Sequence, residues 1–157
     1  AEIYGGYARP LGSRASWEIG VVSYVFPRPP VAPGYDYTEV FVGLSFDTVS
    51  TRVYYSNDYF GGGARSVYAE INGSRQIGEH AALLGHVGVL GQHQPAPTPD
   101  ASPPPSSALD FKAGVAIDIA EFTLELSIVG STSPNNACPV GVGRCGTTPV
   151  LSVSKQF

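Results

Sequence analysis

Apolar and polar residues alternate along most of the chain with a period of two. The clearest example is AEFTLELSIVG, residues 120–130, in which Phe122, Leu124, Leu126 and Ile128 oppose Glu121, Thr123, Glu125 and Ser127. Successive side chains of a strand point to opposite faces, so this alternation predicts β-structure. The same pattern predicts nine strands, at residues 2–9, 16–26, 38–48, 50–57, 65–74, 81–91, 108–118, 121–130 and 149–157.

The connections between these segments are of two kinds. Four are short, namely PLGSRA, DTVS, RQIGEH and DIAE, and four are longer and rich in Pro, Gly, Asn and Ser, among them DYFGGGA after the fourth strand. The two kinds alternate strictly, which is typical of outer-membrane barrels with short periplasmic turns and long external loops. The chain is therefore predicted to be all-β, an antiparallel up-and-down transmembrane β-barrel in one domain over residues 1–157.

The composition supports a lipid environment for the apolar face of the predicted sheet. It also argues against nucleic-acid-binding proteins and helical membrane proteins. Charged residues make up 14%, against roughly 25% in ordinary soluble domains, and the only lysines are Lys112 and Lys155. The net charge of −4 gives no basic field, which argues against nucleic-acid binding. The sequence contains no run of eighteen apolar residues, so it predicts no membrane-spanning helix. If the apolar side faces lipid, Leu126→Arg should be far more damaging than Ser127→Arg.

The C-terminal sequence VLSVSKQF predicts an assembly signal. Leu151, Val153 and Phe157 share one face and end the chain on an aromatic residue, the pattern that outer-membrane barrels present to the barrel-assembly machinery. Lys155 falls on the same face, where its stem can lie along lipid while its ammonium group reaches water.

Several segments resemble a known family. The stretch IGVVSYVFP, residues 19–27, the elements DYTEV, GLS and VYYSNDYFG within residues 35–73, and the ending SVSKQF are similar to the TorF-type family of outer-membrane porins, long described as of unknown function. The resemblance implies the cell outer membrane of a Gram-negative bacterium, with membrane lipids and lipopolysaccharide around the barrel. Family members begin with three further strands, so it also implies a twelve-stranded barrel that lacks about three N-terminal strands here.

Strand parity points the same way. Bacterial single-chain barrels normally have an even number of strands and both termini in the periplasm. Nine predicted strands therefore require an odd number before Ala1, unless the barrel closes differently or residues 2–9 are not a strand.

The polar faces of the predicted strands supply candidate lumen-lining residues. These are Glu18, Glu39, Arg52, Tyr54, Glu70, His86, Asp110, Lys112 and Glu125, with Glu2 and Tyr68 on the same faces. One interpretation is a set of paired charges that closes the barrel interior, and the other is a cation-favouring pore lining, since carboxylates outnumber Arg and Lys. Cross-strand neighbours should compensate the cations: Glu39 or Glu70 for Arg52, and Glu125 for Lys112.

Other chemistry is weakly indicated. No Gly-x-Ser-x-Gly nucleophile motif is present, and His80, His86 and His93 lack metal-site spacing, so the sequence predicts no enzyme, no catalytic residue, no cofactor and no metal. Aromatic residues near the external strand ends favour a membrane-interface girdle over a sugar-stacking site; they are Tyr24, Phe26, Tyr35, Tyr37, Tyr55, Tyr59 and Phe60.

Cys138 and Cys145, the only cysteines, lie in a Gly-rich predicted external loop and are expected to form a disulfide in the oxidising periplasm. The function predicted is a porin or channel for small polar or cationic solutes. The alternative is a closed structural or docking barrel whose external loops bind a partner, and a soluble sandwich is third. The sequence leaves open a homo-oligomer or a protein partner.

Overall fold

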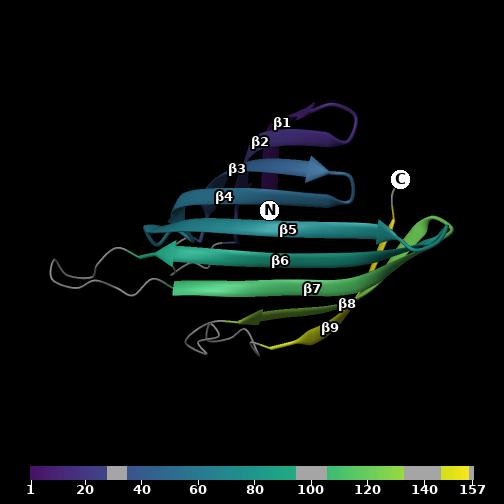
Figure 1. The fold of residues 1–157 in the computed structure, drawn as a ribbon. Helices are drawn as coiled ribbons and strands as arrows, with labels where there is room; N and C mark the ends of the chain where they lie inside the picture. Colours follow the sequence, from purple (N-terminus) through teal and green to yellow (C-terminus); the bar gives the residue numbers. More distant parts are fainter. Residues whose placement is uncertain (28–34, 95–105, 133–145, 156–157) are drawn as a thin grey trace.

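The computed structural model describes residues 1–27, 35–94, 106–132 and 146–155, and they form one antiparallel sheet (Figure 1). Each of the nine predicted segments is a strand, so the all-β, up-and-down prediction is confirmed. The strands are β1 (Glu2–Pro10), β2 (Ala15–Tyr24), β3 (Tyr37–Phe46), β4 (Val49–Tyr59), β5 (Ala64–Gln76), β6 (Ala81–His93), β7 (Ser106–Ile119), β8 (Phe122–Thr132) and β9 (Thr148–Lys155). Each pairs with the next in chain order.

The sheet is curved but open. Figure 1 shows β5 to β7 in front, with β1 and β9 turning toward the far side. Within the described ranges β1 pairs only with β2 and β9 only with β8, so both edges are free. The part of the chain seen here is therefore a trough with a convex and a concave face.

The predicted alternation of short and long connections fails at one point. β4 continues through a bulge to Tyr59 and β5 begins at Ala64, which leaves a turn of only Phe60–Gly63. Phe60, Gly61 and Gly63 all have positive φ, and the Gly63 amide donates to Asp58 Oδ1 at 2.6 Å. The glycine run predicted as a long loop is thus a tight turn, because glycine adopts positive φ without steric cost.

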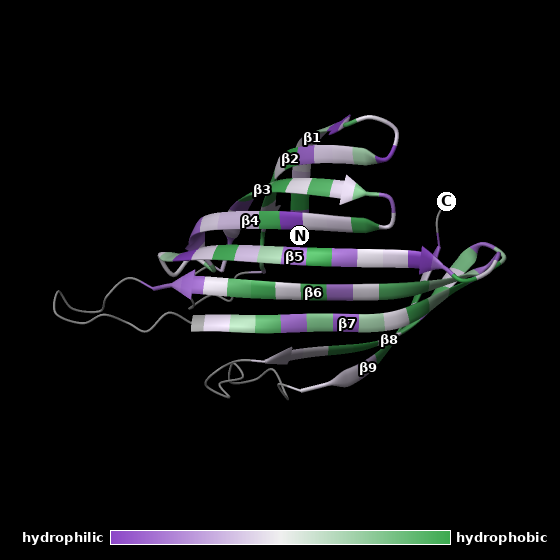
Figure 2. Ribbon diagram, viewed as in Figure 1, coloured by the Kyte–Doolittle hydropathy of each residue, from purple (hydrophilic) through white to green (hydrophobic). Residues whose placement is uncertain are grey.

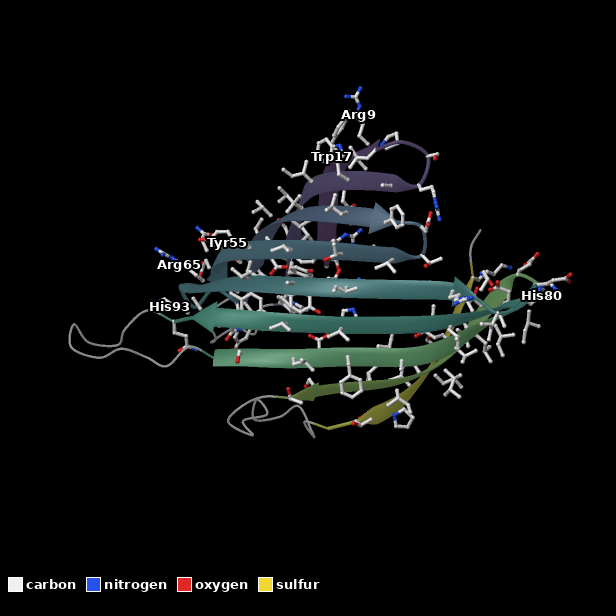
Figure 3. All side chains as sticks on the ribbon, in the orientation of Figure 1. Arg9, Trp17, Tyr55, Arg65, His80 and His93 are labelled. Carbon is white, nitrogen blue, oxygen red and sulfur yellow. The ribbon has the colours of Figure 1, made fainter. Side chains whose placement is uncertain are left out.

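The two faces of the sheet differ in polarity. Large apolar side chains on the convex face are exposed, as for Ile3, Leu126 and Leu151 at 68%, 61% and 66%. Figure 2 shows green and pale or purple positions alternating along the strands, and Figure 3 shows Trp17 and Tyr55 projecting away from the sheet, with Arg9 near Trp17 and Arg65 near Tyr55. Among the described residues the buried apolar side chains are only Val22, Ala64 and Ala82. The sheet is inside-out relative to a soluble domain, which buries its apolar face.

The structure bears on three further predictions, concerning Ser127, the C-terminal assembly signal and the two cysteines. Ser127 is only 3% exposed and packs so closely that a Cβ on Gly114 would lie 2.7 Å from its own Cβ, so the expectation of a mild Ser127→Arg is wrong. Leu151 and Val153 lie on the convex face of β9. Phe157, Cys138 and Cys145 fall outside the described residues. No helix in the described ranges is long and apolar enough to cross a membrane.

Candidate functional site

The nine candidate lumen residues all lie on the concave face. Strand register places Glu18, Gly43, Arg52, Glu70, Gly88 and Asp110 in one row across β2 to β7. Four other candidates lie two or four residues along a strand from a member of this row: Glu39, Tyr54, His86 and Lys112. Glu125 is in register with Ala116, which lies six residues along β7 from Asp110. Because side chains an even number of residues apart on a strand point to the same face, all of them share the face of the row. The structure thus gathers these side chains into one surface, which we call the polar network.

Arg52 is paired with Glu18, and the predicted partners Glu39 and Glu70 are wrong. Arg52 Nε donates to Glu18 Oε1 at 2.5 Å, although β3 lies between their strands. Gly43 is the β3 residue in register with both, and a Cβ there would lie 2.7 Å from Glu18 Oε1 and 3.0 Å from Arg52 Cγ. The missing side chain lets the two charged groups meet over the intervening strand, a route that adjacent-strand reasoning does not include.

A chain of hydrogen bonds continues from Arg52 into β5. Arg52 Nη1 donates to the Tyr54 hydroxyl at 3.5 Å, and this hydroxyl donates to Glu70 Oε1 at 3.3 Å. Glu70 is therefore linked to Arg52 through Tyr54, although the register pairs the two residues directly.

His86 is the centre of the second half of the network. Its Nε2 lies 2.6 Å from Asp110 Oδ1, its Nδ1 lies 2.7 Å from Asn72 Oδ1, and Glu70 Oε2 is 3.9 Å from Nδ1. The side chain of His86 is only 15% exposed, so these oxygens replace water around the ring. Asn72 was not identified from the sequence, although its register with His86 places it opposite on the same face.

Tyr68 closes this half of the network over a second glycine. Its hydroxyl donates to Asp110 Oδ1 at 3.1 Å and lies 3.2 Å from His86 Nε2. A Cβ on Gly88 would lie 2.1 Å from the same hydroxyl and 2.8 Å from Asp110 Oδ2. Gly88 in β6 therefore has the same role as Gly43 in β3: it leaves room for polar groups from the two flanking strands to meet.

The predicted ion pair of Lys112 with Glu125 is confirmed, with Lys112 Nζ 3.0 Å from Glu125 Oε1. A groove of about 550 Å³ runs beside it and includes His86 and Asp110 in its lining. A smaller cavity of about 220 Å³ is lined by Glu18, Arg52 and Tyr54. The concave face thus combines paired charges with space for water-sized solutes.

The predicted aromatic girdle is mostly wrong. Tyr24, Tyr37 and Tyr59 turn to the concave face, where Tyr37 stacks on Tyr24 at 4.7 Å and contacts Tyr59 at 4.8 Å between ring centroids. Phe26 and Phe60 join them, and Tyr35 contacts Phe60. We call these six residues the aromatic cluster. Tyr55 alone of the seven lies on the convex face with Val67, where a girdle belongs.

Glu39 lies beside the aromatic cluster. It is only 6% exposed, it faces Val22 on β2, and it interacts electrostatically with the hydroxyls of Tyr24, Tyr37 and Tyr59. It forms no ion pair or hydrogen bond with any residue that the structure describes. Among the nine candidates it is the one carboxylate of the polar network that no described residue pairs with or hydrogen-bonds.

Ligand chemistry of other kinds has little support in the described ranges. They contain no group of three His, Cys, Asp or Glu placed to hold a metal ion. His80 and His93 lie at opposite ends of the sheet in Figure 3, far from any shared site. The contacts of His86 are to Asp110, Asn72, Glu70 and Tyr68.

Gly43→Val should separate Glu18 from Arg52 and lower the free energy of unfolding by about 1–2 kcal/mol, because the added carbons occupy the space where the two groups meet. The control is Gly85→Val, since a Cβ at Gly85 meets nothing within 4 Å. Denaturant titration in detergent measures both. Equal losses from the two variants would show that the contact over Gly43 contributes nothing.

The comparisons with known proteins give a family but no activity. No curated protein and no solved structure matches the chain. The profile of a family described as "Bacterial protein of unknown function (Gcw_chp)" matches residues 1–148, nearly the whole sequence. Nothing in this match concerns porins, so the resemblance to the TorF-type family stays a prediction. The chain belongs to the Gcw_chp family of bacterial proteins.

Proposed function

We propose that this chain is part of an outer-membrane β-barrel that conducts small polar or cationic solutes. The observation that carries the proposal is the apolar band on the convex face. On β5 the convex positions between Arg65 and Arg75 are Val67, Ala69, Ile71 and Gly73, so a charged residue bounds the apolar stripe at each end.

The length of this stripe fits a bilayer. Ten residue steps at about 3.3 Å each span roughly 33 Å along a strand, and a tilt of about 40° reduces this to roughly 25 Å. The apolar band of outer-membrane barrels is about 25 Å tall. At the same end as Arg65, Tyr55 and His93 also lie on the convex side (Figure 3), as expected where the band meets water.

The concave face supports passage of cations. Of the nine candidate residues, Glu18, Glu39, Glu70, Asp110 and Glu125 are carboxylates, whereas Arg52 and Lys112 are the Arg and Lys residues. Excess carboxylate along a pore favours cations. The free edges of β1 and β9 leave room for the further strands of a twelve-stranded barrel, and Leu151 and Val153 would be read by the assembly machinery.

A closed structural or docking barrel is the second candidate, and one observation favours it. Arg52 and Lys112 each contact a carboxylate. Hydrogen bonds join Glu18 to Glu70 on one side and His86 to Asp110 on the other, with Glu70 3.9 Å from His86 between them. Charges that compensate each other across an interior can close it.

Planar-bilayer recording of the full-length protein separates the two candidates. A channel should give discrete single-channel steps with a reversal potential that favours cations, and replacing Glu18 and Glu125 by Gln should weaken that preference. Insertion is verified separately by protease protection of the protein in lipid vesicles. Verified insertion without conductance would reject the channel and leave the closed barrel.

A further inference from the structure

A depression of about 440 Å³ lies on the convex face, at the end of the sheet that carries the β4–β5 turn. We call it the convex depression. The convex-face residues that line it come from four neighbouring strands: Tyr55, Arg65, Val67, Gly91, His93 and Ser107. Figure 3 shows Tyr55, Arg65 and His93 together at this end of the sheet. The polar network lies on the opposite, concave face, so the convex depression is a separate feature of the molecule.

Gly91 keeps the convex depression open. It lies in register with Val67 on β5 and Ser107 on β7, in a convex row where a side chain would otherwise continue the apolar band. A Cβ at Gly91 would have one atom of the described residues within 4 Å, the Val67 carbonyl oxygen at 3.9 Å. No described side chain therefore covers Gly91, and the walls of the depression are largely carbon.

The polar side chains around the convex depression can all donate hydrogen bonds. Arg65 and His93 are directly opposite each other on β5 and β6, and Tyr55 and Ser107 add hydroxyl groups from the flanking strands. No Asp or Glu is among the described residues that line the depression, although the sequence has 13 Asp and Glu residues against 9 Lys and Arg. Arg65 forms no ion pair with any residue in the described ranges. A guanidinium group beside further donors and without a carboxylate favours an anion.

The position of these donors selects the kind of anion. In the next convex row toward the middle of the sheet, Val89 and Leu109 are in register and both exposed, so the depression opens onto the apolar band. A ligand that contacts both surfaces has an anionic head and an apolar chain. Phosphate matches the head better than a carboxylate does, because it offers more acceptor oxygens to donors that come from several strands, and arginine binds it through two parallel hydrogen bonds.

We infer that the convex depression binds the phosphate group of a phosphorylated membrane lipid, with the phosphate against Arg65 and His93 at its rim and an acyl chain over Gly91. The inference rests on the part of the proposed function that places the convex face in a membrane. It does not depend on conductance.

Native mass spectrometry of the detergent-solubilised protein, titrated with dioctanoyl phosphatidic acid, tests the inference. We expect saturable binding of one lipid, and at least about tenfold weaker binding of dioctanoylglycerol, which has the same chains without the phosphate. The succinate ester of dioctanoylglycerol carries a carboxylate in place of the phosphate and should also bind more weakly. Inorganic phosphate in excess should not displace the lipid, because it lacks the acyl chains.

Two substitutions test the two halves of the convex depression separately. Gly91→Leu should weaken binding of phosphatidic acid by about tenfold or more, because leucine occupies the space of the acyl chain. The fold should be retained, since the new Cβ has ordinary contact distances. Arg65→Gln should cause a loss of similar size, because it removes the charge that meets the phosphate. Circular dichroism verifies the β-structure of both variants.

The matched control is Arg75→Gln. Arg75 lies on the same strand and the same face as Arg65, but it is in register with Leu83 and not with a histidine. Its lipid affinity should equal that of the parent. Equal losses from Arg65→Gln and Arg75→Gln, or an unchanged affinity in folded Gly91→Leu, would overturn the inference.

The other ligands distinguish the sources of the anion. Binding of dioctanoylglycerol or its succinate ester as tight as that of phosphatidic acid would contradict a phosphate site, and displacement of the lipid by inorganic phosphate at equal concentration would contradict a lipid site. Lipid binding without bilayer conductance would reject the channel and keep this site, whereas conductance without lipid binding would do the reverse.

Discussion

Leu126→Arg should lower the free energy of unfolding in a lipid bilayer by about 2–4 kcal/mol, as expected for a cation placed on the lipid side near the bilayer midplane. Leu126 lies in the middle of β8 on the convex face, 61% exposed in the isolated chain, and is in register with Val115 and Leu151. The guanidinium group of the introduced arginine would have to enter hydrocarbon or distort the bilayer to reach water. Urea titration of the protein folded in vesicles measures the loss.

The control for this substitution is Ser152→Arg. Ser152 is at the depth of Leu126 but on the concave face, exposed, and in register with Glu125, so the new cation meets water and a carboxylate. We expect a change within about 0.5 kcal/mol. Ser127 is unsuitable because it is buried against Gly114. A larger loss from Ser152→Arg than from Leu126→Arg would invert the face assignment.

His86→Leu should lower the free energy of unfolding by about 3 kcal/mol. The imidazole lies within hydrogen-bonding distance of Asp110, Asn72 and Tyr68, and leucine leaves these polar groups without that partner where the His86 side chain is only 15% exposed. Denaturant melts at constant pH provide the measurement. This loss is expected only if His86 is held in the polar network, because replacing a solvated surface histidine would change the free energy of unfolding very little.

His80→Leu is the matched control, since His80 lies in the β5–β6 turn, where the structure leaves its side chain exposed. Its stability should be unchanged. Adding Asp110→Asn to His86→Leu should recover part of the loss, because the amide removes the charge that leucine leaves unpaired. Equal effects of His86→Leu and His80→Leu would show that the network contributes nothing to stability.

The strands and their faces could be predicted from the sequence because one residue type dominates each face. In β8 the apolar residues Leu124, Leu126 and Ile128 share one side without interruption, and a period of two has a single structural interpretation. Lys112 and Glu125 could be matched because their strands are adjacent and both residues are charged and long enough to meet.

The remaining features depend on geometry that alternation does not contain. Glu18 meets Arg52 only because Gly43, which lies between them on β3, has no side chain. Predicting this contact requires the register of β2, β3 and β4 together.

Tyr59 turns inward because a bulge at the end of β4 sets its direction. A bulge changes the face to which the following side chains point, and the local sequence does not predict where this bulge occurs. Tyr24 and Tyr37, by contrast, share the strand parity of Glu18 and Glu39, so alternation alone places them on the concave face.

Spin-label accessibility along β6 in lipid vesicles tests the central claim most directly, that the convex face lies in a membrane and the concave face does not. Residues 83–90 alternate without interruption between exposed and less exposed positions. Nitroxides at odd positions should collide mainly with oxygen dissolved in lipid, and those at even positions mainly with a water-soluble nickel reagent or with neither. High nickel accessibility at the odd positions, or no period of two, would contradict the claim.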